Sequence, residues 1–249
     1  TDNDFSKKNQ LYLMELQNSS PIIMAKYIHL NIELGTLPTA RNKSLPFLIN
    51  PYVLFIDDDA FCNKNVIFSL QELINLYPDY ISFGLRIIQG KESEPEAFLK
   101  NIPHFSIFYW TRGNFNVSNI GNLEVEHLQG TCMCFHTASL IDIGGFNENL
   151  SVGYASFEDT EICLRIYNKF GNLVFCPKAI VTHGLAPREK GFPRNMSSPK
   201  FVFSYARNGT YTLLKNYYKN INAIICLIFL VPIVNFKRIF VDYGNKISI

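Results

Sequence analysis

The 249-residue sequence is 47% apolar and 14% aromatic with a net charge of +2, which supplies a core for one large domain or for a domain with an appendage. Its six cysteines stand mostly in apolar runs and form no CxxC pair, so we expect reduced, buried thiols in a cytoplasmic protein and no zinc site. From the residues at its start we expect no signal peptide.

The charge is unevenly distributed. Residues 1–183 hold 13 Lys/Arg against 19 Asp/Glu, whereas residues 184–249 hold 10 Lys/Arg against 2 Asp/Glu. A basic tail on an acidic body suggests an anionic partner for the tail, namely lipid headgroups, nucleic acid or a phosphorylated substrate. The tail lacks a nucleic-acid-binding motif, so we expect no nucleic-acid partner.

Hydrophobic patterning predicts helices and strands that alternate along the chain. In order, we expect a helix at 7–17, a strand at 26–30, a helix at 37–48, a strand at 52–56, a helix at 65–76 and a strand at 80–88. An irregular aromatic stretch at 89–122 precedes a strand at 131–135, helices at 137–143 and 158–170, and short strands at 173–175 and 180–182. This alternation argues for an α/β fold with a largely parallel sheet.

The tail has a different pattern. Residues 200–218 form an aromatic, basic helical pattern, and residues 221–236 are uncharged and interrupted by Pro232. The uncharged stretch is short for a membrane span, which needs roughly 20 apolar residues. An interfacial helix with Lys237 and Arg238 at the headgroups fits better, and the alternative is a hydrophobic helix packed on the core or on a second subunit.

Three consecutive carboxylates, Asp57, Asp58 and Asp59, directly follow the strand expected at 52–56. Like charges this close destabilise a fold unless a cation neutralises them. Mg²⁺ and Mn²⁺ prefer carboxylate oxygens and are often shared with substrate phosphates. Ligands of open α/β sheets bind beyond the carboxyl ends of strands, where this triplet would lie. The alternative is a solvated acidic turn that caps the next helix.

A second acidic cluster and a histidine lie downstream. Glu158, Asp159 and Glu161 open the helix expected at 158–170, where the helix dipole and free N–H groups favour carboxylates without any catalytic role. Held near a metal and a phosphate, such a carboxylate is also placed to accept a proton from an attacking hydroxyl. His183 follows the last predicted strand and is either a structural histidine or a third protein ligand of the metal.

Five motifs in order resemble glycosyltransferase family 2, the inverting nucleotide-sugar transferases with the GT-A fold. They are Leu34-Gly35-Thr36 with Thr39-Ala40-Arg41-Asn42, Phe55-Ile56-Asp57-Asp58-Asp59, Gly144-Gly145-Phe146-Asn147-Glu148, Glu158-Asp159-Thr160-Glu161 with Leu164-Arg165, and Pro177 through His183. The resemblance covers about residues 1–185. In the tail, Tyr205-Ala206-Arg207-Asn208 is more loosely similar to bacterial rhamnosyl- and galactofuranosyl-type members.

The resemblance implies a fold and a domain organisation. The fold would be the Rossmann-like GT-A fold of the α/β class, with a mixed, mostly parallel sheet and a C-terminal helical appendage. Residues 1–185 would form the catalytic domain, and residues 186–249 a basic and apolar tail in contact with a membrane surface or a second copy of the chain. The resemblance places Asp2 at the end of the family's second strand, so we expect the family's first βα unit to be missing from this sequence.

The resemblance also implies a role for each motif residue. A Mn²⁺ or Mg²⁺ ion would be held by Asp59, Asp57 and His183. The nucleotide-sugar would be bound by four residues: Asp2, Arg41, Asp57 and Asp58. Asp159 would be the catalytic base, with Glu158 beside it.

The implied function is metal-dependent, inverting transfer of a sugar from a UDP- or dTDP-sugar to a hydroxyl of a glycan or a lipid-linked acceptor, in cell-surface polysaccharide synthesis. We expect a cytoplasmic enzyme at the inner face of the cell membrane, with homo-oligomerisation as a further expectation. Two alternatives stay open. One is a non-catalytic or truncated GT-A-like binding module, and the other is a sugar nucleotidyltransferase.

Overall fold

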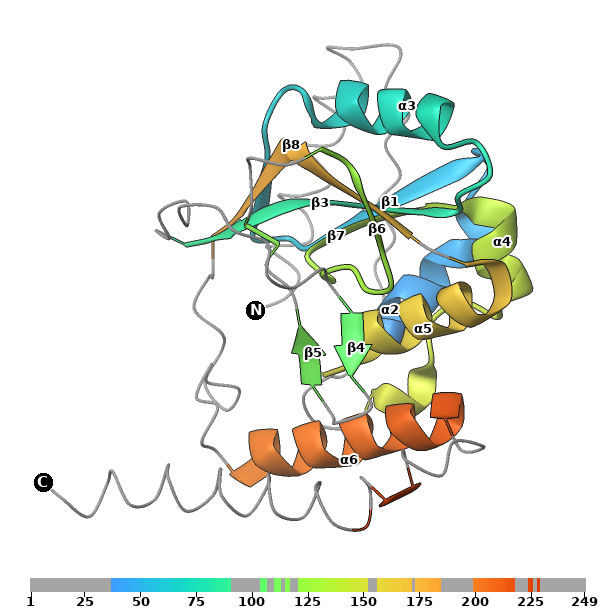
Figure 1. Cartoon of the computed structure of the whole chain (residues 1–249), viewed down its shortest axis with the longest axis vertical. Coiled ribbons are helices and arrows are strands. Elements are labelled where there is room, and N and C mark those ends of the chain that lie inside the picture. The colour runs from blue at the N-terminus through green and yellow to red at the C-terminus, as the bar shows by residue number, and fades with distance from the viewer. Residues whose placement is uncertain are drawn as a thin grey trace, which may run out of the picture. The chain divides into compact units, whose positions relative to one another are not determined.

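The computed structural model describes residues 37–90, 104–106, 110–112, 115–116, 121–151, 156–171, 173–184, 199–217, 224–225 and 228 (Figure 1). All of them belong to one compact unit, Leu34–Ile249. The elements expected at 7–17 and 26–30, Asp2, and most of the apolar stretch at 221–236 lie outside the described residues.

A mixed sheet forms the centre of this unit, in the order β1-β7-β3-β8-β2 with β6 paired to β8. The strands are β1 (Tyr52–Ile56), β2 (Ala60–Cys62), β3 (Ser82–Gln89), β6 (Leu123–Val125), β7 (Cys132–His136) and β8 (Leu173–His183). β3 and β8 pair in parallel, whereas the other described pairs of this sheet are antiparallel. The α/β class with a mixed sheet is confirmed. The parallel share is smaller than expected because β7 enters between β1 and β3 in the opposite direction, which strand–helix alternation does not reveal.

Helices cover both faces of the sheet. Figure 1 shows α3 (Val66–Leu76) on one side and α5 (Glu158–Phe170) on the other. α4 (Thr137–Asp142) packs on the α5 side through Leu140. Residues of β7 alternate between the two layers, since Cys132 and Cys134 pack with the α3 cluster and Met133 and Phe135 with the α5 cluster. This period of two is the geometry of a strand buried on both faces.

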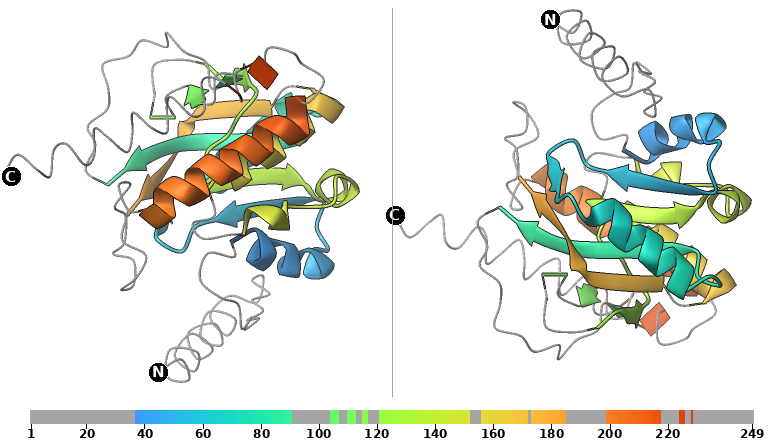
Figure 2. Two further views of the ribbon diagram at one scale, coloured as in Figure 1. Left: turned by 90° about the horizontal axis from the view of Figure 1, so that it is seen from below. Right: turned by 90° about the horizontal axis from the view of Figure 1, so that it is seen from above.

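Three further helical segments complete the described chain. α2 (Leu37–Ser44) continues into the 3₁₀ turn η1 (Leu45–Phe47), and a second turn, η2 (Glu148–Leu150), follows the double glycine. α6 (Pro199–Tyr217) packs on α5. In the left view of Figure 2, which looks at the domain from below, α6 runs across the face toward the viewer. Within the described part of the chain, no helix has the length and apolar character to cross a bilayer.

Most predicted boundaries hold, and local chemistry explains them. β1 and α5 span the predicted residues, and α5 stops at Gly171, whose φ of 98° suits a residue without a Cβ. In α3, Val66, Leu70 and Leu73 form the buried stripe. Ile67, next to Val66 in the sequence, is 64% exposed, because successive residues of an α-helix point about 100° apart around its axis.

Several features differ from the sequence predictions. The two short strands expected at 173–175 and 180–182 are one strand, β8, with a register irregularity opposite Leu85 and Arg86. The region expected to be irregular contains a hairpin of β4 (His104–Ser106) and β5 (Trp110–Arg112). Cys62 is exposed on the short edge strand β2, which corrects the expectation that every cysteine is buried. The four other described cysteines are buried free thiols, as expected: Cys132, Cys134, Cys163 and Cys176.

Candidate functional site

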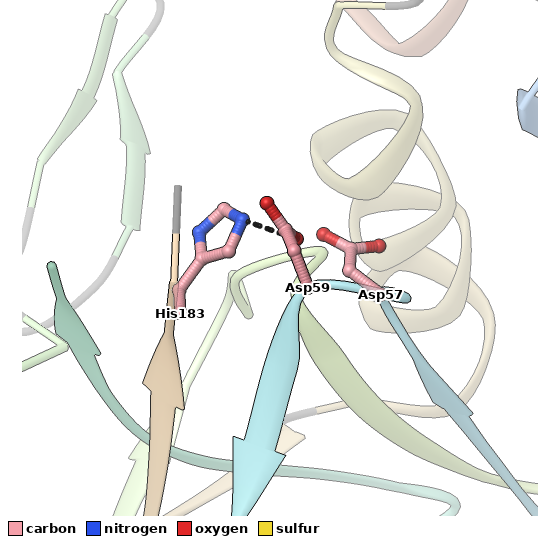
Figure 3. A group of neighbouring side chains, drawn as sticks. All are labelled: Asp57, Asp59 and His183. Atoms are coloured by element: carbon pink, nitrogen blue, oxygen red, sulfur yellow. Dashed lines mark ion pairs between the residues drawn. The ribbon is translucent and has the colours of Figure 1, made fainter. Parts of the chain in front are cut away.

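Two carboxylates and one imidazole meet at one end of the sheet. Asp57 and Asp59 lie in the turn between β1 and β2, and His183 ends β8, where it is paired with Ala60 of β2. One ligand atom from each of the three side chains lies within 4.8 Å of the other two, and Figure 3 shows the side chains facing one another. Nε2 of His183 lies 3.0 Å from Oδ1 of Asp59.

The orientation of His183 is set by its other ring nitrogen. Nδ1 lies 2.9 Å from Oε1 of Gln89, the last residue of β3, and 3.3 Å from Oγ1 of Thr131. The amide oxygen of Gln89 only accepts, so Nδ1 donates to it and Nε2 is the ring nitrogen that faces Asp59. Two acceptors at that separation repel unless a proton or a metal ion lies between them. Adjacent ligands of an octahedral ion bonded at about 2.1 Å are about 3.0 Å apart, so the spacing suits a divalent metal.

A buried arginine anchors Asp57 from the opposite side. Arg41 on α2 is 6% exposed. Its Nη2 lies 3.3 Å from Oδ1 of Asp57 and 3.0 Å from the carbonyl oxygen of Gly130, and it donates to both. Burial raises the pKa of Asp57, and the Arg41 charge opposes that rise. Arg41 therefore fixes this carboxylate in place and helps to keep it ionised in a largely desolvated position.

Asp159 and Glu158 begin α5 and differ in environment. Oδ2 of Asp159 accepts from the backbone N–H of Gly130 at 3.0 Å, and Oδ1 accepts from the N–H of Thr160 at 2.7 Å. Glu158 is buried, and its Oε1 lies 3.9 Å from Nη1 of Arg41. Burial, reinforced by the neighbouring Asp159 carboxylate, raises the pKa of Glu158 to about 8. Of the two residues, Asp159 is partly exposed and Glu158 is buried.

The metal cluster and the α5 carboxylates belong to one electrostatic site. The Asp159 charge contributes to the raised pKa of Asp57, and Arg41 faces both Asp57 and Glu158. The remaining sequence candidates stand apart. Asp58 is exposed in the turn, outside the group of possible metal ligands, and Asp2 lies outside the described residues.

Sequence reasoning missed residues that complete the site from distant parts of the chain. Gln89 and Thr131 orient His183, and Gly130 holds both Arg41 and Asp159. Gln89 pairs with His183 in the parallel β3–β8 register, so its position at a strand end was the available signal. Nothing in the local pattern of 126–131 points to Gly130.

A further missed residue lies deeper in the domain. His127 is buried, and its ring meets that of Phe115 at a centroid distance of 5.5 Å. Burial lowers the pKa of His127, and the Asp159 charge partly opposes that change. The lowered pKa of His127 favours the neutral form of its buried ring.

Comparison with protein families gives one match. The glycosyl transferase family 2 profile matches residues 12–144, more than half of the chain. That range includes Arg41 and the Asp57–Asp59 turn, whereas Asp159 and His183 lie beyond its end. No curated protein matches the sequence significantly.

Comparison with solved structures gives several matches in fold. The structure of S. aureus TarS residues 1–349 in complex with UDP-GlcNAc matches with a TM-score of 0.54 and 16% identity, over 93% of this chain and 60% of that one. GalNAc-T7 with UDP, GalNAc and Mn²⁺ matches with a TM-score of 0.52 and 16% identity, over 71% of this chain and 35% of that one. The chain thus spans between about a third and three fifths of the length of these structures. At this identity the likeness shows the fold.

Proposed function

This chain belongs to glycosyl transferase family 2, and from that premise we propose that it transfers a sugar from a UDP- or dTDP-sugar to a hydroxyl of a glycan or lipid-linked acceptor. The proposed setting is cell-surface polysaccharide synthesis. One observation carries the proposal. A group of side chains that could hold a metal ion lies at one end of the sheet, in electrostatic contact with the partly exposed Asp159. The members of this group are Asp57, Asp59 and His183.

The cluster fits a Mn²⁺ or Mg²⁺ ion. Two carboxylates and one imidazole are a donor set that Mn²⁺ accepts readily, and the 3.0 Å separation of Nε2 and Oδ1 matches neighbouring coordination positions. Gln89 would keep Nε2 free for the ion. When bound, such an ion would neutralise the diphosphate and the charge that develops on it as it leaves.

Asp159 would act as the general base. Its carboxylate accepts a proton from the acceptor hydroxyl while that oxygen forms a bond to the anomeric carbon. The bond from that carbon to the diphosphate breaks, and the nucleoside diphosphate leaves with the electron pair. One displacement from the opposite face inverts the anomeric centre. The Gly130 N–H donates to Oδ2 of Asp159 and would hold the carboxylate in position at the start of α5.

The other candidates would contribute to the donor site. Asp58, exposed beside the cluster, is proposed to meet the nucleoside, as is Asp2. Arg41 is buried and bonded to Asp57, so its proposed effect on the nucleotide is exerted mainly through the position of Asp57. Glu158, whose pKa is raised to about 8 by burial, would be mostly protonated near pH 7 and would place a neutral carboxyl 3.9 Å from Nη1 of Arg41.

The tail is proposed to hold the enzyme at an acceptor-bearing membrane or against a second copy. Its basic excess supports the membrane contact. Because α6 packs on α5, the test is deletion of residues 218–249, which leaves α6 in place. The full chain should float with anionic vesicles and the shortened chain should not, whereas equal partitioning would refute a membrane role for residues 218–249.

Turnover is the direct test of the function. UDP release would be measured with UDP-GlcNAc and other UDP-sugars, and dTDP release with dTDP-sugars, for wild type, Asp159→Asn and Asp79→Asn. Asp79 is an exposed carboxylate before β3 and serves as the control. Asp159→Asn should lose about 100-fold or more of the turnover, in line with loss of a general base, and Asp79→Asn should retain it. Equal turnover in all three would refute the role of Asp159.

A further inference from the structure

Two adjacent residues of α6 hold the chain segment that leads into α5. Nδ2 of Asn208 donates to the carbonyl oxygens of Leu150 at 3.1 Å and Ser156 at 3.2 Å. Nη1 of Arg207 donates to the carbonyl oxygen of Asn149 at 2.7 Å and to Oδ1 of Asn208 at 2.7 Å. One amide thus ties together two backbone positions on either side of residues 151–155.

Asn208 is a buried polar residue of α6, not a surface one. Its exposed fraction is 0%, and it lies on the side of α6 that faces the domain. An amide at this depth must have its donors satisfied, and Nδ2 of Asn208 finds acceptors in the main-chain carbonyls of Leu150 and Ser156, outside its own helix. The geometry therefore couples α6 to the backbone and not only to side chains.

The held segment ends in a strained residue. Phe157 has φ 67° and ψ 9°, and it is the one non-glycine residue with positive φ in the described part of the chain. L-residues adopt this conformation only when their surroundings enforce it. The Phe157 ring packs on the ring of Tyr205, one turn before Asn208 on α6, at a centroid distance of 4.6 Å, and it joins a cluster with Leu164 and Leu213.

The strained residue directly precedes the catalytic carboxylates. Phe157 caps α5, and its carbonyl oxygen accepts from the N–H of Glu161 at 2.8 Å. The backbone conformation at Ser156 and Phe157 therefore sets the direction in which the Asp159 side chain projects from α5. This direction determines whether Oδ2 of Asp159 accepts from the N–H of Gly130.

We propose that Asn208 is a positioning residue for Asp159, acting through Ser156 and the left-handed Phe157. This inference rests on the proposed role of Asp159 as the base. It also assigns to α6 a part in forming the catalytic site, beyond any contact that the tail makes with a membrane or a second copy.

The test variants separate positioning from stability. Asn208→Asp replaces the donating amide with a carboxylate that faces two carbonyl oxygens, and Asn208→Ser is a milder second variant. Asn216→Asp is the control on the same helix, because Nδ2 of Asn216 donates to the carbonyl oxygen of Thr212, within α6, at 2.9 Å. Lys215→Met weakens the packing of α6 on α5, because it removes the 2.9 Å bond from Lys215 Nζ to the buried Glu161. It leaves the bonds of Asn208 to the carbonyls of Leu150 and Ser156 in place.

Three readouts are made on the full chain: dissociation constant of UDP-GlcNAc with Mn²⁺, turnover with that donor, and hydrogen exchange of the Gly130 amide. Asn208→Asp should keep the dissociation constant within about twofold and lose roughly 10- to 100-fold in kcat, as expected for a displaced reactive group. Its Gly130 amide should exchange at least about 10-fold faster, because loss of the bond to Asp159 exposes that N–H. The Asn216→Asp and Lys215→Met variants should match wild type in kcat.

The kinetic and exchange measurements can overturn the positioning role of Asn208 in two ways. Wild-type kcat and wild-type Gly130 exchange in a folded Asn208→Asp or Asn208→Ser variant would overturn the inference. Equal losses of kcat in Lys215→Met and Asn208→Ser at equal melting temperatures would also overturn it, since stability alone would explain them. If wild type shows no turnover with any donor, the proposed function fails, and the Gly130 exchange still tests whether Asn208 positions Asp159.

Discussion

Gly130→Ala should displace Asp159, the proposed base, without disturbing the proposed metal ligands Asp57, Asp59 and His183. A Cβ at residue 130 would lie 3.2 Å from both Cβ and Oδ2 of Asp159. Since carbon contacts settle at about 3.5 Å or more, Asp159 must retreat by a few tenths of an ångström. A displacement of 1 Å costs roughly 100-fold in rate, so we expect a kcat loss of about 3- to 10-fold.

The assay compares Gly130→Ala with Gly121→Ala, where an added Cβ meets nothing within 4 Å. Neither glycine has the positive φ that would strain an alanine. The dissociation constant for UDP-GlcNAc with Mn²⁺ should stay close to wild type in both variants, and kcat should fall in Gly130→Ala alone. Equal kcat in both variants would refute the placement of Asp159 as the base.

Three further predictions concern pH, packing and metal affinity. The pKa of Glu158 is raised from 4.5 to about 8, so between these pH values the folded state keeps a proton on Glu158 that the unfolded state has lost. The free energy of unfolding of the metal-free protein should therefore fall as the pH rises from 4.5 to about 8. Urea titrations over this pH range should show a smaller fall for Glu158→Gln than for wild type. Gly84→Ala should destabilise by about 1–3 kcal/mol, since the new Cβ lies 2.3 Å from Leu128; an unchanged urea midpoint contradicts this. Gln89→Leu should weaken Mn²⁺ binding by about 10-fold or more, measured by calorimetry, and unchanged affinity would remove Gln89 from the site.

Sequence patterns predicted those parts of the fold that short-range chemistry decides. The apolar run 52–56 and the turn of carboxylates after it gave β1 and its end, and the amphipathic pattern closed by Gly171 gave α5. The grouping of Asp57 and Asp59 with His183 followed from the ends of strands, because these meet at one edge of an α/β sheet.

The rest depends on long-range contacts that no local pattern encodes. β2 has three residues and no periodicity, and it exists because Ala60 pairs with His183. Arg41 reaches Asp57 and Gly130 only after α2 has docked. Asn208 joins carbonyl groups more than 50 positions away, so its sequence motif suggested a similarity but no role.

Calorimetric titration of UDP-GlcNAc and a dTDP-sugar, with Mn²⁺ and after its removal by EDTA, tests the central claim most directly. Wild type and Asp59→Asn would be compared, with Asp79→Asn as the exposed-carboxylate control. The account predicts binding of at least one donor that requires Mn²⁺, survives in Asp79→Asn and weakens by about 10-fold or more in Asp59→Asn. Donor binding of equal strength with EDTA, or in Asp59→Asn, would contradict the assignment of Asp57, Asp59 and His183 as the metal site.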